Sequence, residues 1–444
     1  MPSCKAKFWR IPRLARRHAL SQTARHMSSS PPVALSPSRA AWIALAFLSG
    51  LNMLNYLDRY VMSAVLPPLR HDLGLSYEGG GWVAAAFMWG YFITAPLFGY
   101  LGDRLPRKYL MLSGVVVWSV ATACSGIAHS FYQLFAIRLF VGVGEAAFVT
   151  MGPSWISDLF ASHKRNTALT LFYVAIPVGS AIGFSIGGWF ADHNDWRGAF
   201  IYTGLPGILM ALGLLFLREP RRGEADGVAE KVTESASIRD VLGLLLNCRY
   251  NLLVWGYAAQ TFAMGAFGVW GASFLIEAHG MENGHAASIF GEILAGTGLV
   301  ATLLGGFLAS SLRKRLSSGY VWVMAMSMLA ATPICFFALI VSSATWSLIG
   351  LGAAMFFLFL PTGPITSQIF EIVPVHLRAS AVALCTFMIH LFGDLGSPTI
   401  VGHLSDGPGG LRHGVLILPG FLLVGGILWT ILIRYTSKPL EVKA

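Results

Sequence analysis

The sequence predicts an all-α membrane protein with twelve transmembrane helices in two pseudo-symmetric six-helix bundles. Three observations predict it: the composition, twelve apolar stretches, and one long polar segment midway along the chain. Of the 444 residues, 55% are hydrophobic and only 12% are charged, with a mean hydropathy of +0.63. Soluble domains have about 25% charged residues. A chain so poor in charge could not cover a soluble surface, which excludes a large soluble enzyme.

Twelve stretches are long and apolar enough to cross a membrane, which takes about 20 residues for about 30 Å of hydrocarbon. Glycines recur within these stretches at the spacing of one helix face, as at Gly179, Gly183 and Gly187. Such glycines allow membrane helices to pack closely. The twelve predicted spans are residues 40–62, 80–101, 109–128, 131–152, 166–190, 197–217, 251–276, 286–310, 319–342, 345–368, 377–403 and 412–434.

The longest polar segment separates the sixth stretch from the seventh and mixes acidic and basic residues. It defines the expected organisation of the chain. We expect a basic cytoplasmic tail or extension over residues 1–39, an N-terminal bundle over 40–217, a cytoplasmic linker over 218–250, a C-terminal bundle over 251–434, and a cytoplasmic tail over 435–444.

The basic residues predict the topology. Of the 31 Lys and Arg residues, 26 lie before the first span, in or at the edges of the even-numbered connections, or at and after the end of the last span, and three lie in or at the edges of the odd-numbered connections. The positive-inside rule therefore places both termini in the cytoplasm and favours an even number of spans. The net charge of +10 would suggest nucleic acid on a soluble chain. Here it reflects topology, and we expect no nucleic-acid partner.

The first 39 residues carry eight basic residues and no acidic one. Three interpretations stay open: a transit peptide, a reading frame that starts at Met27, or a basic cytoplasmic tail. The five cysteines have no paired spacing, so we expect no metal site and no cofactor. Short odd-numbered connections and the absence of Asn-x-Ser/Thr favour a bacterial inner membrane, while the transit-like tail leaves an organelle membrane open.

Four charged residues fall within the spans of the first half: Asp58, Arg59, Arg138 and Glu145. A charge inside a membrane is costly, so each is a functional candidate. The pKa of each carboxylate depends on burial and on the two arginines, so a change of pairing could take up or release a proton. Arg59, on one helix face with Asn55, suits a phosphate or another anionic head group. The alternative is a static ion network that only fixes helix packing.

The second half has fewer charges within its spans. His390, Asp394 and Ser397 share one face of the eleventh span, since residues three, four and seven apart lie on one side of a helix. His390 could donate to a phosphate or carboxylate from across the cavity, with Asp394 beside it. Alternatively, His390 is a packing residue bonded to Asp394. Glu292 on the eighth span is expected to be another buried acid.

The connection between the second and third spans reads GYLGDRLPRK, from Gly99 to Lys108. Asp103 lies at a helix end, where it can pair with an arginine or with a neighbouring helix N-terminus. We expect Gly99, Asp103, Arg104, Arg107 and Lys108 to form a clasp that holds one conformation and breaks in another. The spacing matches the cytoplasmic signature of the major facilitator superfamily. The alternative is a basic loop that merely follows the positive-inside rule.

The fourth span contains RLFVGVGEA, which fits a second signature of that superfamily. Its GVGEAA also matches a dinucleotide-binding pattern, but that pattern requires a preceding strand. The words NYLDRY, VGVGEA, AIPVGS and GDLGSP resemble the Spinster family of the superfamily, over about residues 40–434. Outside this range lies the basic N-terminal extension.

The resemblance implies the major facilitator fold and proton-linked or facilitative export of lysophospholipids or lipids similar to sphingosine 1-phosphate. It places proton-sensing acids at Asp58 and Glu145, with Arg138 beside them, and a histidine near the lipid at His390. We therefore expect a secondary active transporter that works by alternating access, with a lipid-like substrate, protons and membrane lipids as partners. We expect it to be a monomer.

Within the carrier class, the alternatives are an exporter of drugs and an uptake carrier for organic anions. A sensor that keeps the carrier fold without transport has less need of a breakable clasp. A membrane-embedded enzyme would need a nucleophile with its base or clustered metal ligands, and an ATP-driven pump would need a nucleotide motif. The sequence offers neither of these.

Overall fold

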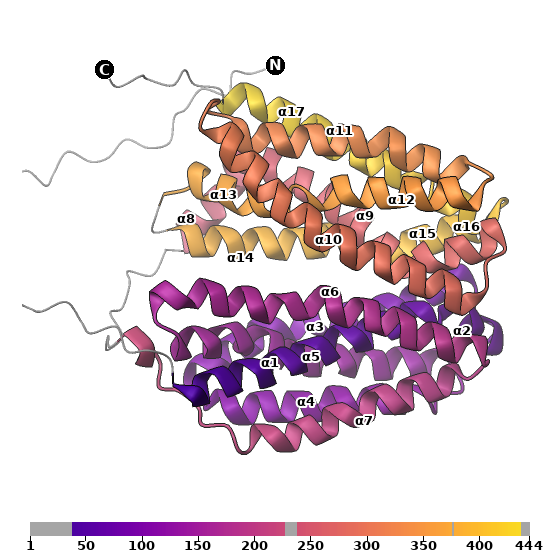
Figure 1. Cartoon of the computed structure of the whole chain (residues 1–444), viewed down its shortest axis with the longest axis horizontal. Helices are drawn as coiled ribbons and strands as arrows, with labels where there is room; N and C mark the ends of the chain where they lie inside the picture. The colour runs from indigo at the N-terminus through magenta and orange to yellow at the C-terminus, as the bar shows by residue number, and fades with distance from the viewer. Residues whose placement is uncertain (1–37, 227–237, 375–376, 437–444) are drawn as a thin grey trace, which may run out of the picture. The chain divides into compact units, whose positions relative to one another are not determined.

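The computed structural model describes residues 38–226, 238–374 and 377–436 (Figure 1). Every regular element in this described part is a helix, and twelve candidate membrane spans lie within it. The predicted all-α fold and the predicted number of spans are thus confirmed. The described elements belong to one unit of the chain, Pro37–Ala444. The three interpretations of the N-terminal extension concern residues outside the described ranges.

Six spans form the first bundle, and the short helix α2 follows the first of them. Several of these helices begin at a capping side chain: Ser38, Ser76 and Ser130 each accept a hydrogen bond from a first-turn amide, as helix N-termini favour. The helices are α1 (Arg39–Ala64), α2 (Leu66–Asp72), α3 (Tyr77–Arg104), α4 (Arg107–Ser125), α5 (Phe131–Leu159), α6 (Ser162–Asp192) and α7 (Trp196–Leu214).

The second bundle follows η1 (Glu224–Asp226), α8 (Ile238–Gly243) and η2 (Leu244–Leu246). Its last three spans are interrupted. Pro361 and Pro398 lie at two of the interruptions, since proline cannot continue a helical hydrogen-bond ladder. The helices are α9 (Cys248–His279), α10 (Asn283–Arg313), α11 (Gly319–Ile340), α12 (Ala344–Phe359), α13 (Thr362–Ile372), α14 (Arg378–Ile389), the π-helical turn η4 (His390–Asp394), α15 (Ser397–Ser405), α16 (Gly410–Gly414) and α17 (Ile417–Thr436).

The predicted close packing at glycines is present within the first bundle. Side chains at Gly179, Gly183 and Gly187 of α6 would overlap the facing residues of α1. Likewise, a side chain at Gly142 of α5 would overlap the backbone of Phe87 in α3. Because glycine has no Cβ, these helices approach each other backbone to backbone. This packing holds α6 against α1 and α5 against α3, and so positions α1 and α5, which carry the charged residues described below.

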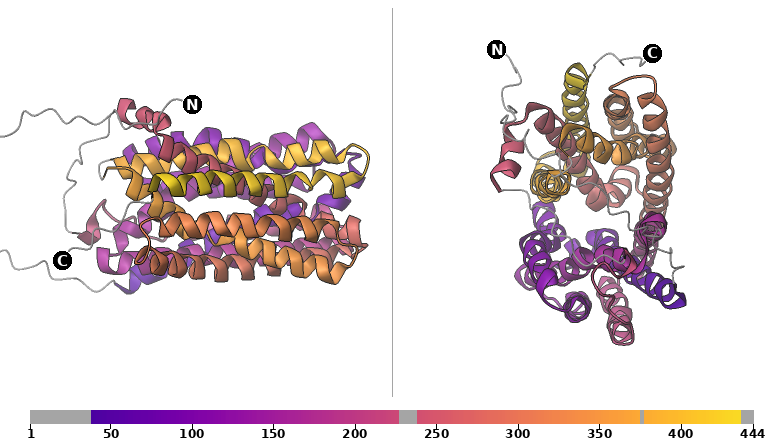
Figure 2. Two further views of the ribbon diagram at one scale, coloured as in Figure 1. Left: turned by 90° about the horizontal axis from the view of Figure 1, so that it is seen from above. Right: turned by 90° about the vertical axis from the view of Figure 1, so that its left-hand side faces the viewer.

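The described part of the chain has two distinct ends along the helix direction (Figures 1 and 2). We call the end with α2 and α16 the α2 end, and the opposite end, with α8, the α8 end. The first span begins and the last span finishes at the α8 end (Figure 1). Termini on one side are what an even number of spans requires.

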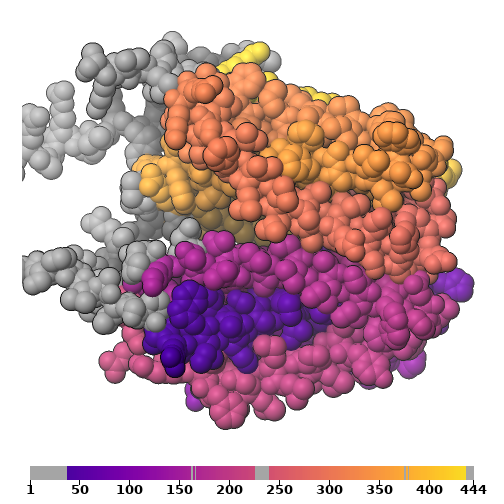
Figure 3. All heavy atoms as spheres, in the orientation of Figure 1, coloured from indigo at the N-terminus to yellow at the C-terminus, as the bar shows by residue number. Residues whose placement is uncertain are grey.

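The bundles are joined by hydrogen bonds and ion pairs only at the α2 end, within the part of the chain that the structure describes. The contributing residues come from α2 and α3 on one side and from α9, α15 and the residue directly after α15 on the other, with a further contact between α6 and α10. In Figure 3, the two bundles also meet in direct atomic contact toward this end. The α2 end is therefore the closed end of this conformation.

Candidate transport site

The central feature of the site is an ion pair between Arg59 on α1 and Glu145 on α5. Nε and Nη2 of Arg59 lie 2.7 Å and 2.6 Å from the Glu145 carboxylate. Glu145 is completely buried, while 15% of the Arg59 side chain is exposed. Charge-assisted bonds this short are stronger than bonds between neutral groups. The pair therefore joins α1 to α5 and leaves an arginine surface that a ligand can reach.

Three aromatic rings surround the Arg59 guanidinium. Its Cζ lies 4.8 Å from the ring centre of Tyr56, 5.1 Å from that of Phe87 and 5.6 Å from that of Tyr91. Cations within about 6 Å of an aromatic ring are attracted to its face. Arg59 is thus held by rings as well as by a carboxylate, which orients its fork before any ligand arrives.

Arg138 and Asp58 lie deeper, with 0% and 2% of their surfaces exposed. The charges of Asp58 and Glu145 both act on Arg138, and its Cζ lies 5.5 Å from the Phe87 ring. The structure therefore brings together the four charged residues that the sequence singles out. Within the described residues, none of the three side-chain nitrogens of Arg138 has a hydrogen-bond partner.

Other polar atoms of this cluster are also unpartnered within the described ranges: both side-chain atoms of Asn55, Oδ1 of Asp58 and Oε1 of Glu145. Asn55 is buried next to Glu145. Buried polar groups nearly always have a partner in proteins, so each exception asks for an explanation. A cluster that exchanges partners, or that receives a polar ligand, explains unused donors and acceptors at the same place.

The second bundle contributes His390 and Asp394 from η4. Nδ1 of His390 lies 3.0 Å from both carboxylate oxygens of Asp394, and both side chains are partly exposed. The charge of Arg59 acts on His390, which puts the two within electrostatic reach. Single π-helical turns are frequent at functional sites. The His390–Asp394 bond, which belonged to the packing interpretation of His390, is present, and the charge of Arg59 reaches this pair from the first bundle.

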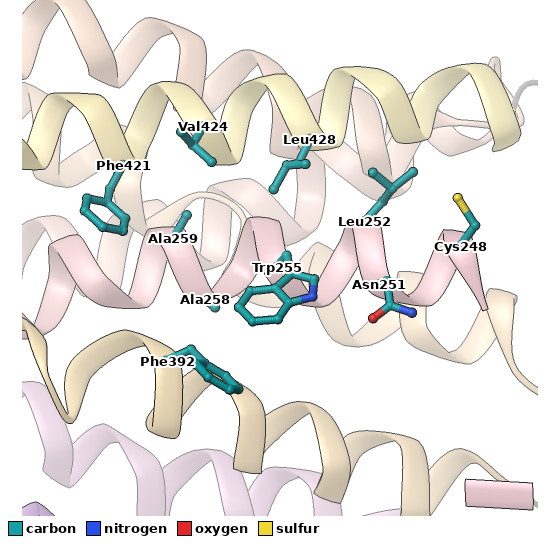
Figure 4. A pocket seen from close by; sticks show the side chains of 10 residues that line it. All are labelled: Cys248, Asn251, Leu252, Trp255, Ala258, Ala259, Phe392, Phe421, Val424 and Leu428. Carbon is teal, nitrogen blue, oxygen red and sulfur yellow. The ribbon is translucent and has the colours of Figure 1, made fainter. Parts of the chain in front are cut away.

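An apolar pocket of about 420 Å³ lies between α9, α17 and η4 (Figure 4). Phe392 lies on its wall, two residues from both His390 and Asp394, and two residues correspond to about half a helical turn. The pocket is therefore on the other face of η4 and is separate from the polar site. Its lining residues are Cys248, Asn251, Leu252, Trp255, Ala258, Ala259, Phe392, Phe421, Val424 and Leu428.

The clasp residues gather at the α8 end of the first bundle. Arg107 is buried and its Nη2 lies 2.7 Å from Oδ2 of Asp158 at the end of α5. Lys108 donates to the carbonyl of Leu215 at 2.6 Å, and Arg104 lies over the ring of Tyr100. Gly99 lines a second pocket, of about 360 Å³, in the same place.

The expected pairing of Asp103 is absent from this conformation. Its carboxylate is exposed and has no hydrogen-bond or ion-pair partner within the described ranges. Arg222 instead donates to the backbone carbonyls of Gly102 and Asp103. The arginine that could pair with Asp103 is engaged elsewhere, because Arg107 pairs with Asp158.

Sequence reasoning missed the acidic partners of this clasp. Glu219, five residues after the end of α7, accepts bonds from the backbone amides of Arg107 and Lys108, and so caps α4. Asp158 accepts a bond from the amide of Gly223 as well as pairing with Arg107. An acid at a helix end beside a basic connection is the sequence signal that could have identified them.

Two further expectations concern Glu292 and metal binding. Glu292 is exposed on α10, so its prediction as a buried acid was wrong. It lies on the same outward stripe as Leu299 and Leu303, because the inner face of α10 is occupied by small residues packed on α6. Within the described residues, no group of His, Cys, Asp and Glu side chains could hold a metal ion.

The comparisons with known proteins agree with this architecture. The family model described as Major Facilitator Superfamily matches residues 48–397. Protein spinster homolog 3 of Danio rerio is 32% identical over 92% of this chain and 88% of its own. The sphingosine-1-phosphate transporter SPNS2 of Danio rerio is 33% identical over 84% and 78%. Such a match over most of both chains defines the class of protein, a major facilitator transporter. The chain belongs to the Spinster family of this superfamily.

A solved structure has the same fold. It is a bacterial homolog of the human lysosomal transporter Spinster in an inward-facing, unoccupied conformation, with a TM-score of 0.81 and 23% identity over 90% of this chain and 98% of that one. Membership of this family makes the protein a multi-pass membrane transporter rather than an enzyme.

Proposed function

We propose that this protein moves an amphiphilic lipid with an anionic or zwitterionic head group, such as a lysophospholipid or a sphingosine phosphate, by proton-coupled alternating access. The relatives named for sphingosine-1-phosphate transport support a lipid of this kind. In this proposal, the bundles over residues 40–217 and 251–434 rock about the site, the chain acts as a monomer, and both termini are cytoplasmic in a bacterial inner membrane.

The observation that carries the proposal is the partly exposed Arg59, oriented by Glu145 and three aromatic rings. An arginine fork binds phosphate oxygens through two parallel bonds. His390 lies within its electrostatic reach from the other bundle. A head group between Arg59 and His390 would contact both bundles at once, which is the arrangement a carrier needs to couple binding to rocking.

The proton step rests on the partners of Glu145. This carboxylate neutralises Arg59 and acts on Arg138, with Asp58 nearby. When an anionic head group binds Arg59, it competes with Glu145 for the same guanidinium. Glu145 can then take up a proton or turn to Arg138, so binding of the head group and protonation of the acids become linked.

The experiment is transport into liposomes that contain the purified full-length protein. Labelled lysophosphatidylcholine, sphingosine 1-phosphate and glucuronate are offered with and without a pH gradient. We expect counterflow of at least one lipid, stimulation by the gradient, and loss of that stimulation in Asp58→Asn and Glu145→Gln. Counterflow of glucuronate alone would favour the organic-anion carrier. Binding without counterflow would favour the non-transporting sensor.

A further inference from the structure

Two carboxylates reach across the bundle interface at the α2 end to cap helices of the opposite bundle. Asp406, directly after α15, accepts hydrogen bonds from the backbone amides of Tyr77 (2.7 Å) and Glu78 (3.0 Å) in the first turn of α3. First-turn amides have no partner within their own helix, and a negative charge there is favourable. The start of α3 is thus capped by the other bundle.

The cap on α3 is shared between the two bundles without overlap. The hydroxyl of Ser76, the N-cap residue of α3, accepts from the third amide, that of Gly79, at 3.0 Å. Asp406 takes the first and second amides. The first bundle by itself therefore leaves two amides of α3 for water or for Asp406, and these two are satisfied by protein only when the α2 end is closed.

The second contact is the counterpart of the first. Asp192, the last residue of α6, accepts from the amide of Gly284 in the first turn of α10 at 2.7 Å. The N-cap residue of α10, Glu282, makes no side-chain cap of its own. A side chain at Gly284 would overlap the Asp192 carboxylate where it stands, so glycine at this position leaves room for the contact.

Each carboxylate follows a glycine by four residues, which gives the same G-x-x-x-D word in both halves. Gly188 precedes Asp192, and a side chain at Gly188 would press against Gly284. Gly402 precedes Asp406, and a side chain there would overlap the backbone of Tyr77. In each case the glycine lets one helix contact the start of a helix of the other bundle, and the aspartate one turn later caps that helix. The two halves thus repeat one device.

We propose that Asp192 and Asp406 are positioning residues of the transport cycle that set how strongly the α2 end closes. This inference rests on the proposed alternating access. Opening the α2 end exchanges three carboxylate–amide bonds for bonds to water, and restoring them recloses it. The carboxylate at the start of α3 comes from the second bundle, and the carboxylate at the start of α10 comes from the first. We call these two contacts together the gate, and each of them holds the bundles together at a different place at the α2 end.

The chain contains a matched control for a simple loss of a helix cap. Asp195 is the N-cap residue of α7 and accepts from the amide of Gly198 at 2.8 Å. Both residues belong to the first bundle, three residues beyond Asp192. Asp195→Ala removes a cap without touching the interface between the bundles.

The test measures the distance between the bundles at the α2 end. In the full-length protein without its native cysteines, spin labels are placed at His71→Cys on α2 and Pro408→Cys in the turn before α16, both exposed. Pulsed electron paramagnetic resonance in liposomes, without substrate or pH gradient, gives the fraction of molecules with the long, open distance. We expect Asp406→Ala and Asp192→Ala each to raise the ratio of open to closed molecules about fivefold, the usual effect of losing one cap.

The asparagine variants test whether a side-chain oxygen at these positions is enough to keep the α2 end closed. Asp406→Asn and Asp192→Asn should open the gate less, because an amide oxygen still caps a helix, and Asp195→Ala should leave the distances unchanged. If an alanine variant does not fold, Gly402→Ala tests the same contact and should also raise the open fraction. An open fraction in the Asp192 and Asp406 variants equal to that of Asp195→Ala would overturn the inference. The measurement needs no substrate, so a failure of lipid transport remains a separate result.

Discussion

Arg59 and Glu145 meet through a single carboxylate oxygen: Nε and Nη2 of Arg59 lie 2.7 Å and 2.6 Å from Oε2 of Glu145. The other oxygen, Oε1, is buried and has no hydrogen-bond partner within the described residues. One carboxylate oxygen of Glu145 therefore carries both bonds to Arg59, and the other oxygen carries none. An ion pair with an unused buried acceptor is suited to exchange partners during a transport cycle.

We predict that Glu145→Gln flattens the dependence of transport on pH and lowers the free energy of unfolding by about 3 kcal/mol, since removing one partner leaves a buried charge uncompensated. Initial rates at several pH values and chemical unfolding in detergent measure the two effects. Glu371→Gln breaks the exposed pair with Arg313 and should cost less than about 1 kcal/mol. A pH profile of Glu145→Gln that matches the wild type would remove Glu145 from proton coupling.

Replacing the arginine fork by a single ammonium group separates charge from geometry. We predict that Arg59→Lys weakens binding of sphingosine 1-phosphate about tenfold, because lysine binds phosphate as a point charge and cannot form two parallel bonds. The affinity is measured by equilibrium binding of the labelled lipid to the protein in detergent. Arg104→Lys, on an exposed residue at the α8 end, is the control. Equal affinities for wild type and Arg59→Lys would argue against a head group at Arg59.

The clasp is predicted to depend on Arg107 rather than on Arg104. Arg107 is buried and pairs with Asp158, so Arg107→Ala should lower the free energy of unfolding by about 3 kcal/mol. Arg104 is exposed, and Arg104→Ala should change it by less than about 0.5 kcal/mol. Unfolding curves of both variants in one detergent give the comparison. Similar losses in the two variants would contradict this assignment.

Gly142 is predicted to be a packing residue. A side chain there would overlap the Phe87 carbonyl of α3, so Gly142→Ala should destabilise the protein by about 2 kcal/mol through overpacking. Gly296 on α10 has open space around it, and Gly296→Ala should be neutral or stabilising by up to about 1 kcal/mol, because alanine is the better helix former. The melting temperatures of the two variants are compared with that of the wild type. An unchanged melting temperature for Gly142→Ala would refute close packing at this position.

The glycines of the fourth span show why the sequence predicted a membrane helix rather than a nucleotide-binding site. The letters GVGEAA match a nucleotide-binding pattern, yet the apolar length around them predicts a membrane helix. The structure uses both glycines for packing, Gly142 against α3 and Gly144 against α4. Length and hydropathy gave the correct prediction of a membrane helix, because a stretch of about 20 apolar residues has few other stable environments.

The sequence by itself determined the twelve spans, the fold class and which charged residues lie within the spans, since the cost of burying charge and backbone in lipid is a local property. Only the tertiary structure decided the partners. Arg138 shares a helix face with Glu145, yet Arg59 from another helix forms the ion pair. Arg107 pairs with Asp158, and Asp103 has no such partner in the described part of the chain. The caps at Asp192 and Asp406 likewise join segments far apart along the chain. Pairing depends on which helices pack together, and helical periodicity cannot specify that.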